Sequence, residues 1–128
     1  MINIKEIAEE QVISLAKNIS LAAITAPKAR GVDNLEIRIA YGKELEQLSE
    51  KLKELHQRTG QEFLLRDSNN VLQSQAVILV GSKVKILGLD CGYCGFNSCK
   101  EKEENAPLAP CFFNSNDLGI AIGSMCSK

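Results

Sequence analysis

The segment Leu35-Glu-Ile-Arg-Ile-Ala-Tyr41 carries apolar side chains at every second position, with a charged or small residue between each pair. A period of two predicts a β-strand that buries one face. Helical patterns flank this strand on both sides, so the chain is predicted to mix helices and strands rather than to form a helical bundle.

Before the strand, Ile4 to Ile24 shows apolar residues at alternating steps of four and three, which predicts an amphipathic helix. The side chains on its predicted buried face are Ile4, Ala8, Val12, Leu15, Ile19 and Ala22. Pro27 and Gly31 place a loop at residues 26–34. After the strand, leucines at helical spacing from Leu45 to Leu55 predict a second helix, and Gly60 supplies its stop.

The remaining segments predict shorter elements. Gln61 to Gln75 is predicted as a short helix plus a turn, and the aliphatic runs Ala76 to Val80 and Val84 to Leu87 as two strands or one broken strand. Caps at Asn114 to Asp117 predict the start of a last helix. The side chains that this helix is expected to turn inward are Leu118, Ala121, Ile122 and Met125.

Together these elements predict an α/β (α+β) fold, a small mixed sheet covered by helices, in a single domain spanning residues 1–128. The last helix has an apolar face but stops at Lys128 without a capping glycine. This ending suggests a chain that ends early or completes its core with a partner, and we expect a homodimer.

Charge and hydropathy argue against a nucleic-acid-binding protein and against a membrane-spanning one. Fifteen Lys and Arg residues nearly balance sixteen Asp and Glu residues, so no broad positive surface is available for nucleic acid. The longest apolar runs, such as Ala76 to Val80, are too short to cross a bilayer, and the N-terminus lacks the pattern of a signal peptide. We therefore expect a cytoplasmic protein without a membrane partner. Cytosolic thiols stay reduced, which favours metal binding over disulfides for clustered cysteines.

Four of the five cysteines form the pattern C-x2-C-x4-C-x11-C, at Cys91, Cys94, Cys99 and Cys111. Soft sulfur ligands in fours select an iron–sulfur cluster or zinc. Glycines within the motif would let backbone N–H groups turn toward a cluster, and the neighbouring rings would cover it. Those rings are Tyr93, Phe96, Phe112 and Phe113. Residues 88–113 are thus predicted to be an embedded metal loop of the 4Fe–4S type; zinc, disulfides and inert thiols are the alternatives.

The fourth ligand has two candidates, Cys111 and Cys126. Pro107 and Pro110 turn the chain back just ahead of Cys111, which favours that residue. Cys126 lies on the last helix and is predicted to be a small buried hydrophobe. The single histidine, His56, is predicted to compensate a helix dipole rather than to bind metal. The charged run Lys100 to Glu104 is predicted to be the solvated part of a short helix.

Family resemblances extend these expectations. The segment Asp90-Cys-Gly-Tyr-Cys-Gly-Phe-Asn-Ser-Cys99 resembles the small 4Fe–4S domain of corrinoid iron–sulfur proteins and related electron-transfer subunits. This resemblance implies a 4Fe–4S cluster held by the four cysteines. The whole chain resembles a group of bacterial and archaeal ferredoxin-domain-containing proteins. The matching segments are residues 25–34, 66–67, 90–99 and 117–124.

That group is distantly similar to the flavin-dependent nitroreductases, whose Ala-Pro-Ser-Ala-Arg-like loop helps to build an FMN pocket at a dimer interface. Ala26-Pro-Lys-Ala-Arg30 resembles this loop, so the resemblance implies a nitroreductase-like fold with Lys28 and Arg30 as FMN-binding residues. Two cations on one loop suit a flavin phosphate or ring carbonyl, although two solvated loop charges would give the same pattern.

Two classes of function follow. The first is an iron–sulfur redox protein that passes single electrons to a flavin or to a partner oxidoreductase. The alternative is a structural or binding module that zinc or a cluster staples together without catalysis. An oxidoreductase that uses both a flavin and a cluster is a further option. The sequence indicates no catalytic residue.

Overall fold

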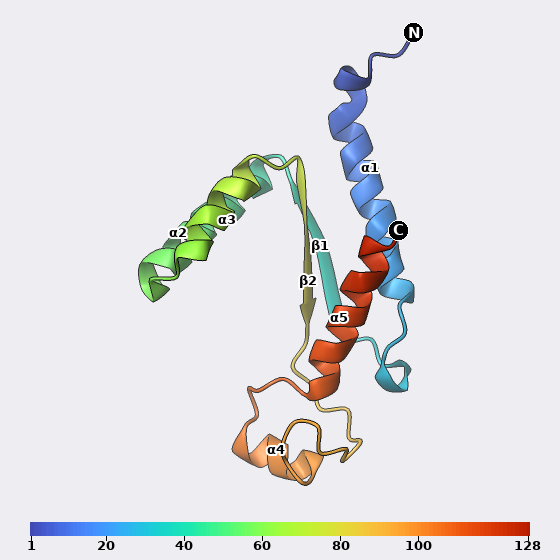
Figure 1. Cartoon of the computed structure of the whole chain (residues 1–128), viewed down its shortest axis with the longest axis vertical. Helices are drawn as coiled ribbons and strands as arrows, with labels where there is room; N and C mark the ends of the chain where they lie inside the picture. Colours follow the sequence, from blue (N-terminus) through green and yellow to red (C-terminus); the bar gives the residue numbers. More distant parts are fainter. The chain divides into compact units, whose positions relative to one another are not determined.

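A computed structural model gives the backbone of residues 1–128 and every side chain except those of Glu6 and Glu9. Its elements, in chain order (Figure 1), are α1 (Ile4–Thr25), the 3-10 turn η1 (Ala29–Gly31), β1 (Leu35–Tyr41), α2 (Lys43–Thr59), α3 (Glu62–Leu72), β2 (Ala76–Ser82), α4 (Cys99–Asn105) and α5 (Phe112–Cys126). The fold is therefore of the mixed α+β type, as predicted.

The sheet is smaller than expected. β1 and β2 form an antiparallel pair, rather than a mixed sheet, and they are its only strands in the described chain. The alternating strand β1 is confirmed, whereas the prediction of a strand at Val84 to Leu87 is wrong. Backbone pairing ends just beyond β2, where the Lys83 N–H donates to the Asn34 carbonyl at 2.8 Å. An aliphatic run without a partner strand has no ladder to join.

The chain divides into two compact units, of which the first comprises Met1–Asn18 and Arg38–Leu79. Its helices α2 and α3 pack side by side as a hairpin (Figure 1). Gly60 ends α2 in the left-handed conformation, with φ of +69°, as the glycine predicted. The apolar core of this unit is made of Ala40, Leu45 and Val71, with Leu48, Leu52 and Val77 packed against them.

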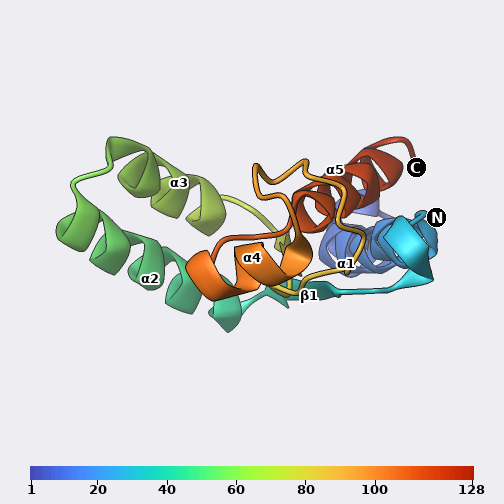
Figure 2. The same ribbon diagram turned by 90° about the horizontal axis from the view of Figure 1, so that it is seen from below.

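The second unit comprises Ile19–Ile37 and Val80–Lys128. Here α5 lies beside the C-terminal turns of α1 in both views (Figures 1 and 2). Two small side chains, Ala23 on α1 and Ala121 on α5, are completely buried. Because neither carries bulk beyond Cβ, backbones can approach closely at these positions. This unit also contains the whole cysteine segment, residues 88–111.

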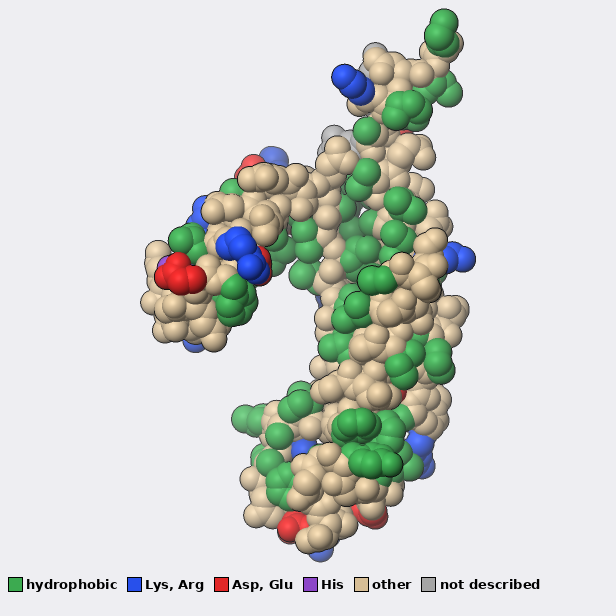
Figure 3. All heavy atoms as spheres, in the orientation of Figure 1, with side chains coloured by type: hydrophobic (Ala, Val, Ile, Leu, Met, Phe, Trp, Pro, Cys, Tyr) green, Lys and Arg blue, Asp and Glu red, His purple; other side chains and the backbone are tan. Residues whose placement is uncertain are grey.

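The predicted buried face of α1 is partly wrong. Ile4 and Leu15 are 70% and 57% exposed, whereas Ala16, Ser20 and Ala23 are buried. The fully buried positions of this helix are thus small side chains, and several of its larger apolar residues are exposed. Hydrophobic side chains lie on the surface over α1 and α5 on the face seen in Figure 3.

The last helix also differs from its prediction. It begins at Phe112, with Cys111 as the N-cap, so Asn114 lies inside the first turn rather than before the helix. Ala121 and Met125 are buried as expected, but Ile122 is 42% exposed and Cys126 is exposed. The buried positions keep a spacing of four, which leaves Ile122 and Cys126 on a neighbouring strip of the helix. None of the helices in the described chain is long and apolar enough to cross a membrane.

Candidate metal centre

Each of the four motif cysteines occupies a different local setting in the second unit. Cys91 and Cys94 lie in the irregular segment between β2 and α4, Cys99 is the first residue of α4, and Cys111 caps α5. Cys91 is exposed, Cys94 and Cys99 are partly buried, and Cys111 is 6% exposed. All five cysteines of the chain are free thiols in the structure.

Asp90 joins the first and third positions of the motif. Its backbone N–H donates to the Cys99 sulfur at 3.3 Å, while the Cys99 N–H donates to the Asp90 Oδ1 at 2.6 Å. Asp90 adopts a left-handed conformation, with φ of +45°, which is uncommon for a residue with a side chain. The reciprocal pair offsets this strain and places a carboxylate at the N-terminus of α4.

The two motif glycines provide the turn that the sequence predicted. Gly92 and Gly95 have φ values of +74° and +86°. The Gly95 N–H donates to the Gly92 carbonyl at 2.9 Å, which closes the chain tightly around Cys94. Other residues adopt this backbone conformation only with strain.

Aromatic contacts connect the loop between Cys91 and Cys94 to the start of α5. The Tyr93 ring centroid lies 5.1 Å from that of Phe112 and 6.3 Å from that of Phe113. Phe112 and Phe113 make an edge-to-face contact at 5.3 Å. Tyr93 is 69% exposed and Phe112 is 41% exposed, and the prediction that these rings cover a cluster stays a prediction. The rings pack on one another rather than beneath other side chains.

Cys111 is held in place by the buried amide of Asn114. The Cys111 N–H donates to the Asn114 Oδ1 at 3.1 Å, and the same oxygen accepts the Lys85 N–H at 3.3 Å. Asn114 is 3% exposed. Its amide therefore ties the first turn of α5 to the segment that follows β2, and Cys111 lies at the N-terminus of α5.

Lys102 connects α4 to the loop that leads into Cys111. Its ammonium donates to the carbonyl of Ala109, two residues before the cysteine. The short helix at Lys100 to Glu104 is confirmed, but the prediction that the whole run is solvated is wrong, because Lys102 is 2% exposed. Cys99 and Lys102 both line a pocket of about 570 Å³.

The donor set fits a soft metal or an iron–sulfur cluster, since four free thiols lie on segments that specific contacts join in pairs. The sulfur atoms are not gathered at one point: among the described side chains, no three of the His, Cys, Asp and Glu type lie close enough to share an ion. The fifth thiol of the chain, that of Cys126, is exposed near the end of α5. His56 lies in the last turn of α2, in the first unit, with its Nδ1 3.0 Å from the Gln61 carbonyl oxygen.

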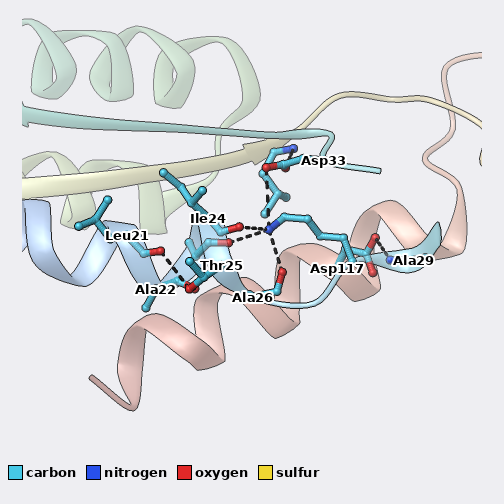
Figure 4. A network of polar contacts seen from close by, with 11 residues as sticks. Leu21, Ala22, Ile24, Thr25, Ala26, Ala29, Asp33 and Asp117 are labelled. Atoms are coloured by element: carbon cyan, nitrogen blue, oxygen red, sulfur yellow. Dashed lines mark hydrogen bonds and ion pairs between the residues drawn. The ribbon is translucent and has the colours of Figure 1, made fainter. Parts of the chain in front are cut away.

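Lys28, one of the two predicted FMN-binding residues, caps the end of α1. Its ammonium donates to the carbonyls of Ala23, Ile24 and Ala26 at 3.0, 2.7 and 2.9 Å. Asp33 lies 3.9 Å away, and the Lys28 side chain is 6% exposed. Figure 4 shows Ile24, Ala26 and Asp33 converging on this ammonium. Carbonyls at a helix C-terminus lack intrahelical donors, so a buried cation here satisfies them.

Arg30, the second predicted FMN-binding residue, lies in η1 with a left-handed φ of +57°. Its Nη1 donates to the Leu87 carbonyl at 2.6 Å. Both loop cations thus have partners within the second unit, and FMN binding stays a prediction.

Sequence reasoning missed two buried polar residues in this unit. Asp117, 7% exposed, accepts the Ala29 N–H at 3.0 Å and so fixes the loop after α1 (Figure 4). Asn114 was predicted only as a helix cap, whereas it is 3% exposed. Their signal was present in the sequence: steps of three and four residues lead from Asn114 through Asp117 to Ala121 and Met125, which puts all four on one helix face.

Comparison with known proteins gives one informative result. No family model and no solved structure matches the chain. An uncharacterized protein of Archaeoglobus fulgidus is 37% identical over 131 residues, a match that covers 97% of this chain and 71% of the archaeal one. Identity at that level over nearly the whole chain shows common descent. The chain belongs to the same family as this archaeal protein.

Proposed function

We propose that the protein is an iron–sulfur redox protein in which Cys91, Cys94, Cys99 and Cys111 hold a 4Fe–4S cluster. The observation that carries the proposal is the reciprocal pair between Asp90 and Cys99, at 2.6 and 3.3 Å, within a C-x2-C-x4-C-x11-C motif. A backbone N–H directed at a sulfur is one of the features by which proteins adjust cluster potentials.

The chemistry that such a cluster supplies is the acceptance and release of one electron at a time. With four thiolates the oxidised centre carries about two negative charges, and one electron from a reduced flavin or a reduced partner protein raises this to about three. The residues of this chain bind the centre and donate hydrogen bonds to it. Cys91 and Tyr93 are exposed, so the motif lies at the surface, where a redox partner can approach.

The deciding experiment is iron and acid-labile sulfide analysis of protein purified without oxygen. We expect about four of each per chain and a broad absorbance near ~400 nm that dithionite bleaches. A colourless protein with one zinc per chain would overturn the redox proposal. Material exposed to air is unsuitable, because released thiols oxidise or pair.

A second candidate, a metal-stapled structural or binding module, is favoured by the spread of the sulfurs. Between Lys83 and Ser98 the described chain forms no helix or strand, and the thiols do not yet converge. A metal that gathered them would contribute directly to folding. This candidate predicts bound metal without a reversible one-electron reduction.

The flavin and dimer proposals need separate measurements. A nitroreductase-like arrangement would release FMN into solution when the protein is denatured, and the FMN would be bound in a homodimer. Flavin fluorescence of the denatured supernatant tests the first point, and light scattering coupled to size-exclusion chromatography tests the second. Protein without flavin would leave the electron-transfer proposal with a partner oxidoreductase as the acceptor.

A further inference from the structure

Lys102 is a charged side chain that the fold buries. It is 2% exposed and among the largest fully buried side chains described. Its ammonium has three N–H donors, of which one reaches a protein acceptor, the Ala109 carbonyl. No carboxylate among the described side chains forms an ion pair with it. A buried ammonium without a counter-charge is costly, so a nearby anion would stabilise it.

The position of Lys102 indicates where that anion lies. Cys99 and Lys102 are three residues apart on α4, a spacing that puts both on one side of the helix. Both line the same pocket of about 570 Å³. The acceptor of its hydrogen bond lies two residues before Cys111. Lys102 therefore links α4, which begins at Cys99, to the loop that leads to Cys111.

We infer that Lys102 is the internal counter-charge of the cluster, holding the Cys111 loop against α4 with one N–H while its ammonium offsets the negative charge of the thiolate-bound centre. The inference rests on the proposed function. It makes Lys102 a positioning residue with an electrostatic effect and not a metal ligand. It also accounts for a buried cation that the fold alone leaves uncompensated.

The charge of Lys102 should act on the reduction equilibrium. Accepting one electron adds a negative charge to the centre, so a nearby cation stabilises the reduced form more than the oxidised form. Removing that cation should lower the midpoint potential. We expect K102M to shift the one-electron equilibrium constant about tenfold toward the oxidised form, which corresponds to about 59 mV.

The test is a redox titration of anaerobic wild type, K102M, K102R and K100M, followed by the cluster absorbance. K100M is the matched control, because Lys100 carries the same charge on the same helix and lines the same pocket, but its side chain is 85% exposed and water screens it. K102R and K100M should keep the wild-type potential, and K102M alone should become more negative. An equal shift in K100M and K102M would overturn the inference, because it would reflect net charge alone.

If K102M does not retain iron, its potential cannot be measured, and iron content in two further variants tests the inference instead. Iron content is then compared in K102R, which keeps the charge, and in K102Q, which keeps an N–H donor without the charge. Rescue by Arg but not by Gln supports the counter-charge, whereas equal rescue by both overturns it. An unchanged potential in loaded K102M sinks this inference alone. A wild-type protein without iron sinks the proposed function as well.

Discussion

The α2–α3 hairpin and the cysteine segment at residues 88–111 are organised by different kinds of interaction. The hairpin joins helices of 17 and 11 residues through an apolar core that includes Leu45 and Val71. The described residues of the cysteine segment form one helix, α4, which has 7 residues. Turns and polar contacts hold the rest of the segment. The hairpin has its stabilising interactions in the chain itself, whereas the cysteine segment is proposed to need metal.

This contrast has an energetic basis. Burying one leucine side chain stabilises a fold by about 1.5–3 kcal/mol, and several such residues meet in the hairpin core. A typical hydrogen bond contributes only about 1 kcal/mol net. The polar contacts of the cysteine segment therefore contribute less than the hairpin core, and four metal–sulfur bonds would supply what packing does not.

The largest effect is expected from removing a ligand. Cys94→Ser should lose the whole cluster, because an alcohol replaces a thiolate in a four-sulfur site. Iron analysis of anaerobic protein measures the loss. Hydrogen exchange should rise in residues 88–111 and stay unchanged in α2 and α3, since the hairpin core is independent of the metal.

Cys126→Ser is the matched control for that experiment. Cys126 is exposed at the end of α5, and its replacement should leave iron content at the wild-type level. If both variants lost iron equally, Cys126 would have to replace Cys111 in the ligand set or join it. If exchange rose in the hairpin too, the contrast between the two regions would fail.

A core substitution should affect the opposite region. Leu45, 6% exposed, lies in the hairpin core, so Leu45→Ala should cost about 2–5 kcal/mol of unfolding free energy. Leu65→Ala, at a position 39% exposed, is the control and should cost much less. Urea denaturation followed by far-UV circular dichroism measures both. Equal costs would show that the hairpin core does not lie where the structure places it.

Elements with a clear period were predictable from the sequence. α1, β1 and α2 follow from repeats of 3.6 or two, and Gly60 marks the end of α2. The predicted strand at Val84 to Leu87 failed because a run of aliphatic residues does not reveal whether a partner strand exists. The buried face of α1 was misplaced because a hydrophobic pattern gives most weight to large apolar residues. The positions that the helix buries are alanines and a serine.

For the candidate site, the sequence supplies a proposed set of ligands and little of the surrounding structure. Cysteine spacing needs no tertiary information, but the burial of Lys102 does, because a charged run usually indicates a solvated helix face. The loop pattern shows two cations, which prompted the flavin prediction for Lys28, but it does not show the helix end that Lys28 caps. A lysine shortly after the end of a helix is a signal for C-capping that could have been used.

The cap formed by Lys28 should have an intermediate effect. Lys28→Met removes three hydrogen bonds from a buried ammonium and leaves carbonyls at the end of α1 without a donor, which should cost about 2 kcal/mol. Lys17→Met, at an exposed position on α1, is the control. Thermal unfolding measures both. A Lys28→Met protein as stable as wild type would show that the ammonium is free for a ligand such as a flavin phosphate.

The smallest effect is expected from the surface pair of Lys83 and Glu36, which joins the start of the segment after β2 to β1 in the second unit. Their charged atoms are 2.8 Å apart, and both side chains are about half exposed. The hydrogen bond to Glu36 and the attraction of its carboxylate raise the pKa of Lys83 above its ordinary value of 10.5. A cation whose pKa is raised by folding stabilises the fold fully at pH values below its pKa in the unfolded chain. The stabilisation disappears as the pH rises through its pKa in the folded protein.

The difference in melting temperature between wild type and Lys83→Met should therefore be small and constant from pH 7 to about pH 9.5, and should shrink above about pH 10.5. High salt should reduce it as well, because exposed pairs are screened. A difference that grew with pH would contradict the assigned sign. A large difference at neutral pH would mean that this surface pair, rather than metal, organises the start of the cysteine segment, and the contrast with the hairpin would then need no metal to explain it.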